Sequence, residues 1–116
     1  MTEPSGGLWV VREAEADRPV LVLHGELDID TLPIAQDHVS AAEAEAPPVL
    51  VLDLGELEYV DSSGVRLVLL AQHVADDAGR RLAVRLGHGS LRRMFDMLGI
   101  TGRLDVLDLD QGEASS

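Results

Sequence analysis

Hydrophobic residues near the start of the chain fall in two short runs, at residues 8–11 and 19–25. Both runs are rich in Val and Leu and are bounded by polar residues, which predicts two strands. The polar segment between them, residues 13–18, is too short for a crossover helix, so we expect an antiparallel pair.

The segment that follows predicts a helix. Its expected N-cap is Asp30 or Thr31, with Pro33 in the first turn, and Pro47 and Pro48 end the pattern. Between these limits the apolar residues recur at the spacing of one helical face. They are Leu32, Ala35, Val39 and Ala42.

Residues 49–54 form a nearly continuous aliphatic run, which is typical of a central strand in a parallel sheet with both faces covered. A second helix is expected from about Ser63 to Ala78, because Gly79 is a favourable C-terminal cap.

The alternation of strand and helix then continues. Residues 81–86 alternate as a strand, Ser90 is expected to cap a third helix that ends before Gly99, and a last strand falls near residues 104–107. Strands that alternate with helices indicate parallel crossovers of one hand. The expected fold is therefore α/β: a single domain with a mixed, mostly parallel sheet of about five strands and about three helices packed on it.

Composition limits the possible functions. A chain of 116 residues has room for one core, so we expect one domain over residues 8–109, with flexible segments at 1–7 and 110–116. The net charge of −12, from 21 acidic and 9 basic side chains, repels nucleic-acid phosphates and anionic membrane surfaces. Direct nucleic-acid binding and membrane insertion are not expected. Without cysteines or a secretory signal, the expected location is the cytoplasm.

The segment Tyr59-Val60-Asp61-Ser62-Ser63-Gly64 carries the most chemical information. It places two hydroxyls and a carboxylate at a helix N-terminus, at the sheet edge where open α/β folds meet ligands and partners. The positive end of the helix dipole favours an anion there, including a phosphate carried by Ser62. The alternative is structural: Asp61 or Ser62 is an N-cap, and Gly64 is a residue of close packing.

The helix after this segment is apolar almost all round in its first turns, and only Arg66 interrupts it. A helix on a sheet needs no more than an apolar stripe. The surplus is therefore expected either beneath the neighbouring helix or on display to a partner. The apolar residues are Val65, Leu67, Val68, Leu69, Leu70 and Ala71.

Three motifs point to a family. Gly25-Glu26-Leu27-Asp28 follows the second strand, Val60-Asp61-Ser62-Ser63-Gly64-Val65 follows the central strand at residues 51–54, and residues 91–100 carry the third helix. In the order and spacing of these motifs, over roughly residues 8–109, the chain resembles the STAS domains of the bacterial anti-sigma factor antagonists.

This resemblance implies a partner switch. The unmodified antagonist binds an anti-sigma factor that is also a serine kinase, and this frees a sigma factor. The kinase uses ATP to phosphorylate the first serine of the Asp-Ser-Ser-Gly motif, here Ser62, until a serine phosphatase reverses it. Phosphorylation adds about −1.5 to −2 charges to an interface that the free hydroxyl had fitted. By this implication the chain is not an enzyme and needs no cofactor.

By the same resemblance, the surface that binds the partner surrounds Ser62 and includes Asp28, Asp61, Ser63, Gly64, Val65 and Arg66. Asp28 matches an acidic position beside the phosphorylation site, but from the residues alone it is equally a turn or N-cap residue before the first helix. Arg66 departs from the family, whose members often have a small residue there. Our hypothesis is that Arg66 pairs with the phosphate or with an acidic group of the partner.

The polar tail, residues 110–116, is a second departure, because related chains commonly end in another helix. Part of the helix layer is then expected to be absent, which leaves a sheet face less covered or open to a partner.

Other classes of function find little support. Neither a calcium loop at Asp28-Ile29-Asp30 nor a Gly-x-Ser-x-Gly nucleophile elbow at Ser62 is complete. No metal site is expected, because metal-ligand spacing is lacking among His24, His38, His73 and His88. The remaining alternative is a stand-alone STAS module without a phospho-switch, such as a transporter subunit, part of a stress-sensing assembly, or a nucleotide or lipid binder.

Overall fold

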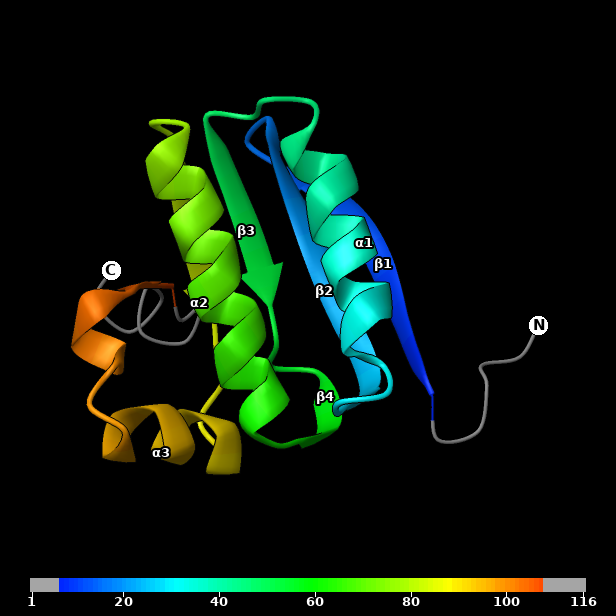
Figure 1. Cartoon of the computed structure of the whole chain (residues 1–116), viewed down its shortest axis with the longest axis vertical. Helices are drawn as coiled ribbons and strands as arrows, with labels where there is room; N and C mark the ends of the chain where they lie inside the picture. The colour runs from blue at the N-terminus through cyan, green and yellow to red at the C-terminus, as the bar shows by residue number, and fades with distance from the viewer. Residues whose placement is uncertain (1–6, 108–116) are drawn as a thin grey trace.

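The computed structural model describes residues 7–107, which form an α/β domain on a six-stranded sheet (Figure 1). The predicted flexible segments at 1–7 and 110–116 lie outside this range, apart from Gly7. In chain order the elements are β1 (Leu8–Glu15), β2 (Arg18–Leu27), α1 (Leu32–Glu43), β3 (Val49–Asp53), β4 (Leu57–Val60), α2 (Ser62–Asp77), β5 (Arg81–Arg85), α3 (Ser90–Met97), the 3₁₀ turn η1 (Thr101–Arg103) and β6 (Asp105–Val106).

The sheet is mixed, as predicted. β1 runs antiparallel to β2, and the other described strand pairs are parallel. The strand order is β1-β2-β3-β5-β6, with β4 beside β2. β4 was not expected. It continues along the last residues of β2 after β3 has ended, and its Glu58 and Tyr59 are exposed, so no alternation of buried and exposed residues marks it as a strand.

The helices build the main core on one face of the sheet. α1 and α2 lie side by side over that face (Figure 1). Leucines of β2, β3 and β5 pack there with apolar residues of α1, α2 and α3. The helical periodicity of the sequence is confirmed, because its four predicted positions in α1 are all buried: Leu32, Ala35, Val39 and Ala42.

The opposite face holds a smaller apolar cluster, to which no residue of the three described helices belongs. Its members are each at most 7% exposed, so the centre of this face is buried within the chain. The expectation of a thinner helix layer concerned residues 110–116, which lie outside the described residues. The cluster consists of Val20, Val22, Val51 and Ala83.

Two helices begin one residue away from the predicted position. α2 starts at Ser62, because Asp61 caps it. Ser90 was predicted to cap α3, and this is wrong: Ser90 is the first helical residue, and Gly89 stands at the N-cap without a side-chain hydrogen bond. Residue preferences alone do not distinguish the cap from the first turn.

Candidate functional site

The candidate site lies at the carboxyl ends of β2 and β4. Leu27 of β2 pairs with Val60 of β4, and the backbone N–H of Asp61 donates to the Leu27 carbonyl at 3.3 Å. This pairing brings the turn before α1 beside the N-terminus of α2 (Figure 1). Asp28 and Asp61, which are far apart in sequence, therefore stand next to each other at one edge of the sheet.

Asp61 is the N-cap of α2. Its Oδ1 accepts a hydrogen bond from the backbone N–H of Ser63 at 2.8 Å, and its carbonyl accepts from the N–H of Gly64 at 2.9 Å. Asp61 thus satisfies two of the backbone N–H groups in the first turn of the helix. This confirms the structural reading of Asp61 and leaves its role toward a partner untested.

Ser62 is the first residue of α2 and is exposed, whereas Ser63 behind it is buried, with 6% of its surface exposed. Among the described residues, the Ser62 hydroxyl has no hydrogen-bond partner. The two adjacent serines are therefore chemically alike but differ in accessibility, and only Ser62 presents its oxygen to another molecule.

Gly64 permits the first turn of α2 to pack closely against Val60 at the end of β4. A Cβ atom placed there would lie 2.4 Å from Cγ2 of Val60, and within 4 Å of side chains from β2 and α3, those of Leu27 and Leu91. A methyl group at this distance requires the backbone or Val60 to move. The prediction that Gly64 is a residue of close packing is confirmed.

Val65 and Arg66 have different surroundings. Val65 is partly buried and packs against the main core, so it offers little surface to a partner. Arg66 is exposed, four residues after Ser62 and hence one turn along the same side of α2. It has no ion pair among residues 7–107, and its predicted pairing with a phosphate stays a prediction.

Asp28 organises the turn between β2 and α1. Its Oδ1 accepts hydrogen bonds from the backbone N–H groups of Asp30 and Thr31, each at 3.0 Å. The buried hydroxyl of Thr31 donates to the carbonyl of Glu26 at 2.8 Å. Thr31 holds the N-cap position of α1 but makes no capping bond with its side chain. Asp28 therefore has a structural role, which does not exclude contact with a partner.

Two exposed apolar side chains border the site, and neither was among the predicted site residues. Ile29 is 64% exposed in the turn after Asp28, and Tyr59 is 50% exposed on β4. An adjacent hollow of about 370 Å³ lies between β4 and the loop from β5 to α3. Its lining includes Glu58, Tyr59, Val60, Gly87, His88 and Ser90.

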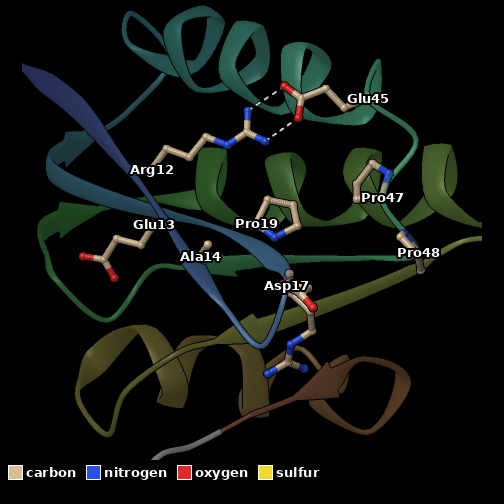
Figure 2. A pocket seen from close by; sticks show the side chains of 9 residues that line it. Arg12, Glu13, Ala14, Asp17, Pro19, Glu45, Pro47 and Pro48 are labelled. Atoms are coloured by element: carbon tan, nitrogen blue, oxygen red, sulfur yellow. Dashed lines mark hydrogen bonds and ion pairs between the residues drawn. The ribbon is translucent and has the colours of Figure 1, made fainter.

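The opposite edge of the sheet has a hollow of about 280 Å³ that includes none of the predicted site residues. Figure 2 shows Arg12 of β1 paired with Glu45 after α1 across this hollow, beside Pro47 and Pro48. The hollow lies near the amino ends of the parallel strands, away from Ser62.

No group of three or more His, Asp or Glu side chains within residues 7–107 is placed to hold a metal ion. None of the helices in that range has the length and apolar character needed to cross a bilayer.

Sequence comparison places these features in a known context. A family model described as "Mlab, STAS domain" matches residues 10–108. Anti-sigma-B factor antagonists from Listeria monocytogenes serovar 1/2a and Listeria innocua serovar 6a are each 25% identical over 103 residues, which cover 89% of this chain and 88% of each relative.

Solved structures show the same fold. An anti-sigma factor antagonist from Mycobacterium paratuberculosis has a TM-score of 0.81 at 22% identity, covering 99% of this chain and 97% of the other. The antagonist SpoIIAA in its unphosphorylated form has a TM-score of 0.72 at 24% identity, covering 91% and 92%. A putative antagonist from Thermotoga maritima has a TM-score of 0.77 at 14% identity, covering 91% and 92%.

Proposed function

The chain belongs to the STAS domain family, and we propose that it is an anti-sigma factor antagonist whose binding is switched by phosphorylation of Ser62. Two curated relatives from Listeria are named as anti-sigma-B factor antagonists, and they match nearly the whole chain. The partners in this proposal are an anti-sigma factor with serine kinase activity and a serine phosphatase, acting in the bacterial cytoplasm.

The observation that carries the proposal is the exposed hydroxyl of Ser62 at the first position of α2. The neighbouring groups are already engaged, since Asp61 caps the helix and Ser63 is buried. A kinase can therefore reach Ser62 without unfolding the helix, and it has no comparable access to Ser63.

The proposed modification changes the surface and leaves the fold in place. The hydroxyl oxygen of Ser62 attacks the γ-phosphorus of ATP held by the kinase, the hydroxyl proton passes to a base of the kinase, and ADP leaves. The resulting phosphate lies at the positive end of the α2 dipole, which favours it. It adds about −1.5 to −2 charges to a surface that had fitted a neutral hydroxyl. Hydrolysis by the phosphatase restores that hydroxyl, and this chain supplies only the acceptor.

Asp28 and Arg66 flank Ser62 from the two directions that a partner would cover. Asp28 lies on the turn before α1, which the pairing of Leu27 with Val60 holds beside Asp61. Arg66 lies one turn further along α2. The proposed surface therefore contains an acidic and a basic group on either side of the switch residue.

The proposal is tested by incubating the protein with ATP and each candidate anti-sigma kinase of its source organism, followed by intact-mass and peptide analysis. We expect one added phosphate on Ser62. Ser62→Ala should abolish it, and Ser63→Ala should not. Absence of phosphate with every kinase would contradict the switch and would favour a STAS module that binds its partner constitutively.

A further inference from the structure

We propose that the groove between α1 and α2 is a second part of the partner surface, and that it receives an apolar segment of the same anti-sigma factor whose binding Ser62 controls. This inference rests on the proposed function and extends it to a surface that phosphorylation does not modify.

The groove is a hollow of about 400 Å³ with two unlike walls. The α1 wall is mainly polar and is formed by Gln36, Asp37, Val39 and Ser40. The α2 wall is entirely apolar and consists of Leu67, Leu70, Ala71 and Val74.

The apolar wall is incompletely covered within the described chain. Leu70 and Val74 are each 45% exposed, and neighbouring Leu69 is 40% exposed. Leu67 and Ala71, by contrast, are buried against the core. The apolar residues of α2 thus fall into two groups, one buried against the core and the other exposed on the surface of the helix. Removing the exposed part from water would favour association.

The groove is continuous with the proposed switch. Ser62, Arg66, Leu70 and Val74 follow one another at intervals of four residues, so each is the neighbour of the next in a row that winds gradually around α2. The rise of an α-helix puts Leu70 about 12 Å from Ser62 along the axis. A partner that covers Ser62 and Arg66 reaches the groove by extending two turns along the same helix.

Charge decides between the possible occupants. The chain carries a net charge of −12, so a second copy would bring the same acidic surface to this face. Like charges across an interface oppose association. Asp37 stands in the polar wall of the groove. The occupant that fits is a foreign segment with apolar side chains flanked by Lys or Arg, and we assign it to the anti-sigma factor.

The test uses the unphosphorylated full chain and each purified anti-sigma factor of the source organism, with affinities measured by calorimetry. Leu70→Ser should weaken binding about tenfold, as truncation of a central apolar contact does. Val74→Thr should weaken it several-fold. The matched control is Val11→Thr, the same change at a residue of similar exposure, 39%, on the opposite sheet face. It should leave the affinity unchanged.

Substitutions at Leu70 and Ser62 should affect binding independently because these residues lie about 12 Å apart along α2. In a Ser62→Asp background, Leu70→Ser should weaken the remaining affinity by the same factor, within about twofold. Thermal unfolding followed by circular dichroism should show that the variants are folded, and Val74→Thr carries the test if Leu70→Ser is not.

Two results would overturn the inference and differ in their meaning. If an anti-sigma factor binds the wild type, and binds Leu70→Ser and Val74→Thr equally well, then the groove is not part of the interface and the proposed function stands. If no anti-sigma factor binds the wild type, then the proposed function fails and the assigned occupant fails with it.

Discussion

Arg85 on β5 donates two hydrogen bonds to the carboxylate of Glu15 on β1, although β2 and β3 separate these strands in the sheet. The shorter bond joins Nη2 of Arg85 to Oε1 of Glu15 at 2.6 Å. The Arg85 side chain is 9% exposed, and that of Glu15 is 39% exposed. The pair therefore links the end of the β1–β2 hairpin to a buried cation on a strand that is separated from β1 by β2 and β3.

The main counter-ion of Arg85 is Glu15, although Asp53 lies directly beside Arg85 on the neighbouring strand β3. Nη1 of Arg85 is 3.9 Å from Oδ2 of Asp53, beyond hydrogen-bond distance. The hydrogen bonds from Arg85 lower the pKa of Glu15, whereas burial raises the pKa of Asp53. The pKa values of the two carboxylates around one guanidinium are thus shifted in opposite directions.

The first prediction concerns this ion pair. Glu15→Gln should lower the free energy of unfolding by about 1 kcal/mol at pH 7, a modest value because Glu15 is partly screened by water. The pKa of Glu15 is lowered in the folded state, so its contribution is present above the ordinary value of about 4.3 and is lost as the pH falls through the lowered value. Urea unfolding of both proteins between pH 3 and about pH 8 measures this.

A matched control is the ion pair of another β1 residue, Arg12. Arg12 makes an exposed ion pair with Glu45, so Glu45→Gln should have no measurable effect on unfolding. A difference between wild type and Glu15→Gln that persists undiminished at the acid end of the series would show that the charge of Glu15 is not its source.

The contrast between this pair and the cap of α2 shows what the sequence can predict. Asp61 acts on residues within one helical turn, so a local pattern of residue types was sufficient to restrict the cap to Asp61 or Ser62. Glu15 and Arg85 are 70 residues apart, and the sequence around each residue does not indicate the other as its partner. The alternation in residues 81–86 predicted a strand but gave no sign that Arg85 would be buried.

The candidate site shows the same limit. Its position at the N-terminus of α2 follows from the motif, but its neighbours depend on β4, which was not predicted. The pairing of β4 with the end of β2 is what brings Asp28, Ile29 and Tyr59 to the same edge. The family resemblance implied that Asp28 lies beside Ser62, but because this pairing is set by tertiary contacts, only the structure added Ile29 and Tyr59 to this surface.

The second prediction concerns the start of α2. Gly64→Ala should lower the free energy of unfolding by about 1 to 2 kcal/mol, because the new methyl group meets Cγ2 of Val60 and this outweighs the better helix propensity of alanine. The double variant Gly64→Ala/Val60→Ala should lose less than the two single changes added together. Gly102→Ala is the control, since nothing lies within 4 Å of the added atom. Wild-type stability of Gly64→Ala would contradict the packing argument.

The third prediction separates the effect of charge at Ser62 on stability from its effect on binding. Ser62→Asp places a negative charge in the first turn of α2 and should raise the free energy of unfolding by about 0.3 to 1 kcal/mol at low ionic strength. Its affinity for the anti-sigma factor should nevertheless fall about tenfold or more. Ser62→Asn, of similar size and without charge, should lose less affinity and gain no stability. A loss of stability in Ser62→Asp would mean that the charge disturbs the fold, and the switch could not then be a surface change.

The fourth prediction resolves the two readings of Asp28. Asp28→Ala removes the acceptor that holds the N–H groups of Asp30 and Thr31, so it should cost about 1 kcal/mol of stability. Asp28→Asn keeps an acceptor oxygen and removes only the charge, and it should unfold at nearly the wild-type urea concentration. We expect the Asp28 carboxylate to contact the kinase as well. Asp28→Asn should therefore weaken binding to the kinase about fivefold while the fold stays intact. The matched control is Asp30→Asn, the same charge change in the same exposed turn, which should bind as the wild type does. Wild-type affinity of Asp28→Asn would instead confine Asp28 to the turn, and the acidic side of the proposed surface would have to be supplied by another residue.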